Sequence, residues 1–73
     1  MLTVERIAPR RYRVAYGGRS REITALYAGT VPYPDAEVVR REVIFRCGGL
    51  GASRAEVAAA ADAVVALMNE ECR

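Results

Sequence analysis

The sequence contains no histidine, no lysine and no tryptophan, and it has only two cysteines among its 73 residues. Without histidine it lacks the commonest metal ligand, and Cys47 and Cys72 do not form a paired zinc-binding motif. Without histidine or lysine, no serine, threonine or cysteine is predicted to have a general base beside it. We therefore expect a chain that is not an enzyme and that holds neither a metal ion nor a cofactor.

Long apolar runs are also missing. No stretch approaches the roughly 20 apolar residues that a membrane-spanning helix requires. Residues 1–5 lack the charged and then apolar layout of a secretory signal. We therefore expect a cytoplasmic protein that makes no membrane contact.

All eleven cationic residues are arginines, and they are unevenly distributed. Residues 1–46 carry nine arginines and five acids, a net charge of +4, whereas residues 47–73 carry two arginines and four acids, a net charge of −2. Six of the arginines lie between Arg6 and Arg21 with no acid among them. Guanidinium groups offer forked donors for carboxylate or phosphate, so this segment indicates a binding surface. A GC-rich coding sequence is the alternative explanation for arginine without lysine.

Length and composition predict one folded domain spanning residues 1–73. About half of the residues are apolar and about a quarter are charged, which is typical of a globular chain. A domain of this size buries only about 60% of its unfolded surface, so its core is small.

The first half of the chain is predicted to form strands. Residues 11–16 alternate between aromatic or aliphatic and charged side chains, which favours a half-buried strand. The turn at 17–20 contains two glycines, and residues 22–28 alternate again, which together predict a β-hairpin. Residues 3–8 alternate weakly and end at Pro9, so they add a short strand or none. The alternation places the hairpin tyrosines in the core rather than on a base-stacking surface: Tyr12, Tyr16 and Tyr27.

A loop and a further strand are predicted next. Residues 29–35 contain one glycine and two prolines, which interrupt both helices and ladders, and Tyr33 lies between the prolines as a candidate contact residue. Residues 37–47 are rich in β-branched and aromatic side chains, which favours a third strand. Arg41 would face the core in that register, so we expect a bulge near Arg40 and Arg41.

The last third of the chain predicts an amphipathic helix. Residues 48–52 include three glycines that end the strand, and Ser53 and Glu56 have the spacing of a capping box. From residue 54 to about 71, apolar residues recur at intervals of three and four. The glycines also occur ahead of phosphate-binding helices, but no Lys-Ser or Lys-Thr pair follows, which favours a plain loop. This helix separates Cys47 from Cys72 by about 28 Å, beyond the roughly 7 Å limit for disulfide Cα atoms, so we predict free thiols.

Together these elements predict an α+β fold: an antiparallel meander of three strands, or four with residues 3–8, with one C-terminal amphipathic helix packed on one face, in the order β-β-β-α. The other sheet face is expected to display several arginines, and it is either a binding surface or a solvated one. The candidate binding residues are Arg11, Arg13, Arg19, Arg21, Tyr33, Arg40, Arg41 and Arg46.

The segment from Cys47 to Ala61 (CGGLGASRAEVAAAA) resembles the last strand, turn and helix of double-stranded RNA-binding domains. The family places a Ser-capped, Ala-rich helix after three antiparallel strands. The resemblance covers about a third of the chain, and Arg54 is the basic residue here at the helix start. It implies the β-β-β-α order and contacts to RNA phosphates.

Two functions follow as expectations. The first is a non-enzymatic protein-binding module, a small regulator or inhibitor of the kind that phages and mobile elements encode, which occludes a larger protein or nucleoprotein partner through the arginine-rich sheet face. The second is nucleic-acid binding through the same arginines, with affinity that falls as salt rises. Self-association as a homodimer is a third alternative, because a small core gains from a second copy.

Overall fold

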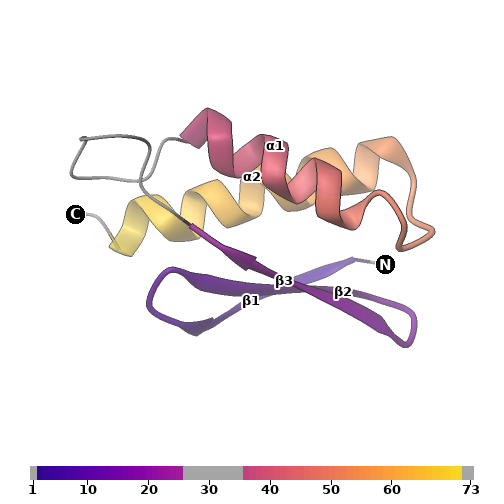
Figure 1. Cartoon of the computed structure of the whole chain (residues 1–73), viewed down its shortest axis with the longest axis horizontal. Helices are drawn as coiled ribbons and strands as arrows, with labels where there is room; N and C mark the ends of the chain where they lie inside the picture. Colours follow the sequence, from indigo (N-terminus) through magenta and orange to yellow (C-terminus); the bar gives the residue numbers. More distant parts are fainter. Residues whose placement is uncertain (1, 26–35, 72–73) are drawn as a thin grey trace.

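The described part of the chain folds into two layers, a three-stranded sheet covered on one face by two helices (Figure 1). This computed structural model describes residues 2–25 and 36–71. Strand β1 pairs antiparallel with β2, and β2 pairs antiparallel with β3, so the sheet order is β1-β2-β3. The elements are β1 (Thr3–Ala8), β2 (Arg11–Tyr16), β3 (Arg19–Thr24), α1 (Ala36–Cys47) and α2 (Arg54–Glu71).

Each pair of neighbouring strands is joined by a turn of two residues. Tyr16 pairs with Arg19, so Gly17 and Gly18 make the second turn, and Gly17 has the positive φ of 62° that such tight turns require. The predicted β-hairpin is therefore confirmed, but its second strand runs over Arg19–Thr24 and not from residue 22 to residue 28, and residues 26–28 lie outside the described residues. The weakly alternating segment at residues 3–8 forms strand β1, which adds a strand to this hairpin.

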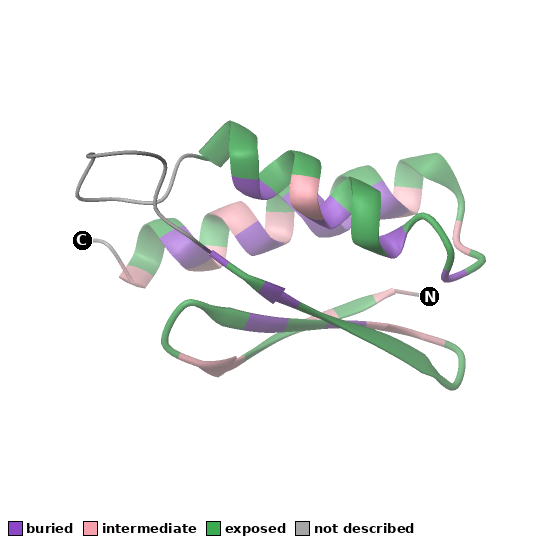
Figure 2. Cartoon of the chain, in the orientation of Figure 1, coloured by how far each residue is buried: buried purple, intermediate pink, exposed green. Residues whose placement is uncertain are grey.

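The hydrophobic core lies between the sheet and the helices (Figure 2). Tyr12, Val14 and Ile23 enter it from the sheet. Of the three tyrosines predicted in the core, Tyr12 is buried, Tyr16 is partly buried against the core, and Tyr27 lies outside the described residues. The buried residues of α2 recur at the predicted intervals of three and four, because helical spacing returns a side chain to the same face at those intervals. They are Val57, Ala60, Ala61, Val64 and Met68.

The prediction of a strand at residues 37–47 was wrong, because Ala36–Cys47 forms helix α1. Val39, Val43 and Cys47 are spaced four apart, and all three are buried against the rest of the core. That spacing gives a helix one continuous buried face, and no bulge at Arg40 and Arg41 is needed. Residues 2–25 and 36–71 therefore form two helices where one was expected, in the order β-β-β-α-α.

A capping box contains two reciprocal bonds between side chain and backbone, and the start of α2 has the bond that the Ser53 side chain accepts. The backbone N–H of Glu56 donates to Ser53 Oγ over 3.2 Å, and the Ser53 hydroxyl donates to Glu56 Oε1 over 3.4 Å. The first bond satisfies one of the N–H groups that a helix leaves unpaired at its N-terminus.

The last turn of α2 is attached to the turn between β1 and β2. The carboxylate of Glu71 accepts the backbone N–H of Arg10 over 2.8 Å and a second hydrogen bond from Arg6 Nε. Partial burial on its own would raise the pKa of Glu71, but the bonds from Arg10 and Arg6 and the hydroxyl of Tyr12 hold it below its usual value. These donors offset the unfavourable position of a negative charge at a helix C-terminus.

Within the described ranges, neither helix combines the length and the apolar character needed to cross a membrane. Cys47 is a buried free thiol, as predicted, whereas Cys72 lies outside the described residues.

Candidate protein-binding surface

Among the described residues, the open face of the sheet carries Arg11 and Arg13 rather than the several arginines that were predicted. Arg13 lies between Glu5 and Glu22 across the three strands, and its Nη1 donates to Glu5 Oε1 over 3.2 Å. Arg11 Nη2 donates to Glu22 Oε1 over 2.8 Å. Two arginines and two glutamates leave this face with no net charge from these four residues. The pairing fits the interpretation of a solvated sheet face better than that of a phosphate-binding one.

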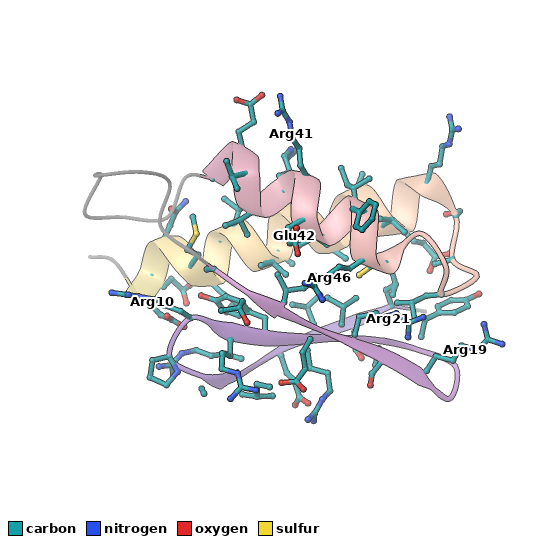
Figure 3. The ribbon with its side chains drawn as sticks, viewed as in Figure 1. Arg10, Arg19, Arg21, Arg41, Glu42 and Arg46 are labelled. Atoms are coloured by element: carbon teal, nitrogen blue, oxygen red, sulfur yellow. The ribbon has the colours of Figure 1, made fainter. Side chains whose placement is uncertain are left out.

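Arg40, Arg41 and Arg46 lie on α1 and not on the sheet, which corrects the predicted shared arginine face. Arg40 pairs with Asp62 of α2, which connects the two helices. Arg41 Nη2 lies 3.4 Å from Glu37 Oε1, and Arg46 pairs with Glu42, so each has a carboxylate one helical turn earlier. Figure 3 shows Arg41 pointing away from the molecule, and Glu42 and Arg46 on the side of α1 that faces the sheet.

Arg19 and Arg21 lie near the C-terminal end of α1, at the side of β3 that faces the helices (Figure 3). Arg19 Nη1 donates to the carbonyl oxygen of Gly49 over 3.5 Å, and Arg21 donates to the carbonyl oxygen of Ser20 over 2.9 Å. Burial raises the pKa of the Cys47 thiol, although the positive charge of Arg21 acts in the opposite direction. Cations at this end of α1 also complement the negative end of the helix dipole.

Seven of the eight predicted binding residues therefore occupy three separate places, and the eighth, Tyr33, lies outside the described residues. Whether any of them contacts a partner stays a prediction. Over residues 2–25 and 36–71, no three His, Cys, Asp or Glu side chains are grouped so that they could hold a metal ion.

The sequence did not reveal that three large apolar side chains of α1 are exposed. We call them the α1 surface, and they are Val38, Ile44 and Phe45, which are 48%, 48% and 84% exposed. In the predicted strand Phe45 would share the core face with Val43, because residues two positions apart lie on the same face of a strand. In a helix the same step rotates the side chain by about 200°, so burial of Val43 exposes Phe45.

A groove lies beside the α1 surface. It has a volume of about 500 Å³ and runs from the end of α1 to the first turns of α2. Ile44 belongs to both the groove and the α1 surface, and Arg54 contributes the charged side chain of the groove. The lining residues are Ile44, Gly48, Ala52, Arg54, Val57 and Ala58.

No protein-family model, curated protein or solved structure matches the chain. The resemblance to double-stranded RNA-binding domains also fails in its first element. Residues 36–47 form helix α1, so the segment Cys47–Ala61 contains the end of one helix, a loop and the start of the next, and it does not begin with a strand.

Proposed function

We propose that this chain is a non-enzymatic protein-binding module, a small cytoplasmic regulator or inhibitor that occludes a larger protein partner with its α1 surface. The observation that carries the proposal is Phe45, an aromatic side chain that is 84% exposed on a well-formed helix. Aromatic side chains dominate the affinity of protein interfaces, where they fill pockets on a partner. The buried free thiol of Cys47 supports the cytoplasmic assignment, because oxidising compartments favour disulfides.

The groove beside the α1 surface extends the contact beyond one residue. The Phe45 side chain is exposed on α1, and its neighbour Ile44 lines the groove. A partner can therefore receive Phe45 in its own pocket and place an apolar side chain between α1 and α2. Such alternation of protruding and recessed apolar groups gives interfaces their shape complementarity.

The positive charge of Arg54 indicates which residues the partner surface should carry. None of the ion pairs formed by the described residues includes Arg54, and Arg54 is one of the residues that line the groove. A carboxylate beside an apolar anchor would satisfy Arg54 through a charge-assisted hydrogen bond. The partner surface is therefore apolar with at least one acidic residue next to its anchor.

Nucleic-acid binding is the second candidate. The observation that favours it is that Arg19 and Arg21 make their hydrogen bonds to backbone carbonyls, so further donors of each guanidinium can reach a phosphate. Binding of this kind would weaken steeply between roughly 50 and 200 mM salt.

The test compares matched variants of the full chain. Wild type, Phe45→Ser and the double variant Arg11→Gln/Arg13→Gln are immobilised and exposed to host lysate. Any protein that is retained is then purified, and its affinity for each variant is measured by calorimetry. We expect Phe45→Ser to weaken binding by at least tenfold and the arginine variant to bind as wild type does.

The opposite pattern, loss with the arginine variant alone, would move the site to the open sheet face and contradict the proposal. Duplex RNA, duplex DNA and single strands are assayed in parallel at both salt concentrations. Salt-sensitive binding that Arg19→Gln/Arg21→Gln abolishes and Phe45→Ser leaves intact would support the nucleic-acid candidate instead.

A further inference from the structure

Strand β1 is an edge strand whose outer side has no partner strand in the described part of the chain. The directions of its backbone groups follow from the neighbouring pairs. The N–H of Ala25 donates to the carbonyl of Arg10 over 2.9 Å, which continues the register of Tyr12 with Ile23. In an antiparallel strand, both backbone groups of one residue point to the same neighbouring strand, and those of the next residue point to the other side. The backbone N–H and C=O groups of Tyr12 and Val14 therefore also point toward β3.

Arg13 and Ala15 must then bond to β1, where their opposite residues are Glu5 and Thr3. The intervening residues Val4 and Arg6 therefore direct their N–H and C=O groups away from the sheet. A short ladder of unpaired donors and acceptors results, ready to pair with a further strand.

An apolar groove accompanies this edge. It has a volume of about 370 Å³ and lies between β1 and α2, with Leu2 and Val4 on one wall and alanines on the other. The alanines leave room beside α2 for side chains of an added strand. The lining residues are Leu2, Val4, Glu56, Ala59, Ala60 and Ala63.

The opposite edge of the sheet is different. All residues of β3 except Ile23 are exposed, and three of the six are charged: Arg19, Arg21 and Glu22. Charged edge strands discourage pairing with other chains. The β1 edge, with its apolar groove, is the edge suited to pairing, and its bulge between Arg6 and Ala8 lies beyond the exposed ladder.

We infer that a second copy of this chain pairs with the outer side of β1. The two β1 strands run antiparallel about a two-fold axis perpendicular to the sheet at Val4, and the sheet continues across the two copies. Val4 then lies opposite Val4 of the second copy, and Thr3 lies opposite the second copy's Glu5. Both helical layers lie on the same side, and the two grooves face each other across the axis.

The charges along β1 select this register. Val4 and Arg6 are the residues of β1 whose backbone groups point outward, so a two-fold axis centred on this ladder lies at Val4, at Arg6, or at Glu5 between them. An axis at Glu5 places two carboxylates directly opposite each other, and an axis at Arg6 places two guanidinium groups opposite each other. Like charges in directly opposed positions are destabilising. The Val4 register avoids both pairs and brings apolar side chains together over the grooves.

Thr3 gives a sharp test, because it is exposed and would lie opposite a glutamate of the other copy twice in the assembly. Thr3→Glu creates two repulsive pairs and Thr3→Arg creates two attractive pairs. We expect Thr3→Glu to raise the dimer dissociation constant by about two- to thirtyfold and Thr3→Arg to lower it by a similar factor. Thr24→Glu and Thr24→Arg, on the opposite edge, are the matched controls and should leave it unchanged.

The measurement is sedimentation equilibrium of the full chain over a range of concentrations. A Val4→Pro variant removes an outward N–H without removing a bond to β2, and it should be monomeric, whereas Ser20→Pro on the β3 edge should dimerise as wild type does. Circular dichroism establishes that both proline variants remain folded.

A monomeric mass up to on the order of 1 mM would overturn the inference, because a dimer weaker than this forms no defined assembly. A dimer that responds equally to Thr3→Glu and Thr3→Arg would also overturn it. A dimer lost in Phe45→Ser and unaffected at Thr3 would place the contact on the α1 surface instead, so this result also separates the dimer from the proposed function.

Discussion

The carboxylate of Glu71 accepts the backbone N–H of Arg10 at 2.8 Å, and thereby joins the last turn of α2 to the turn between β1 and β2. Arg10 has a φ of 61°, a conformation that side chains with a Cβ adopt rarely. The contact thus depends on an uncommon backbone geometry, in which the turn directs an N–H group at the helix end.

Removing the charge of Glu71 should lower stability and change its pH dependence. The pKa of Glu71 is held below its usual value, so its contribution is complete above about pH 4.5 and is lost as the pH falls through the folded-state pKa. We expect Glu71→Gln to lower the free energy of unfolding by about 1 kcal/mol at pH 7 and by less at pH 3. Urea unfolding at both values measures this, with the exposed neighbour Glu70→Gln as control. An equal loss at both values would contradict the assignment.

The backbone at Arg10 can be tested apart from its side chain. Arg10→Gly and Arg10→Val both remove the guanidinium, but glycine accepts a positive φ whereas a β-branched residue does so poorly. We expect the glycine variant to be more stable than the valine variant by at least about 1 kcal/mol in urea unfolding. Equal stabilities would mean that the turn adopts another conformation in solution.

Because α1 is a helix, truncating Val43 should reduce stability more than truncating the larger Phe45. Val43 is fully buried and Phe45 is 84% exposed. We expect Val43→Ala to lower the free energy of unfolding by about 2 kcal/mol and Phe45→Ala to change it by no more than about 0.5 kcal/mol. Thermal unfolding measures both. The reverse order would favour the strand register in which Phe45 is buried.

The cap of α2 contributes through one hydrogen bond. Replacing Ser53 by alanine leaves the N–H of Glu56 without its acceptor, so we expect a loss of about 1 kcal/mol. Ser53→Asp keeps an acceptor at that position and should stay within a few tenths of wild type. Guanidinium unfolding of the three proteins gives the comparison, and an identical midpoint for all of them would exclude a role for the cap.

The sequence predicted the parts of the fold in which local signals agree. The β2 to β3 hairpin combines strict alternation with two glycines at the turn, and α2 combines a capping pair with a three-and-four apolar period. Residues 36–47 contain conflicting signals. Their β-branched and aromatic content favours a strand, whereas the spacing of Val39, Val43 and Cys47 fits a helix equally well. The three consecutive charged residues Arg40–Glu42 carried the deciding information, because a strand buried on one face must turn one of them inward.

The candidate site was harder to predict, since it depends on that one element. A strand at residues 37–47 would bury Phe45 and would bring Arg40 and Arg46 onto the same sheet face as Arg11 and Arg13. The acids that neutralise the arginines also come from distant elements. Arg40 pairs with Asp62 of α2, and Arg13 with Glu5 of β1, so a basic stretch in the sequence does not become a basic face.

The contact between Arg10 and Glu71 spans 61 positions of the chain. Closing so long a loop costs conformational entropy before any favourable interaction compensates for it, so this contact should form late, after the hairpins and helices exist. The last turn of α2 then becomes an indicator of complete folding. Amide hydrogens in that turn should exchange at rates close to those of global opening, although the ends of most helices exchange by local fraying.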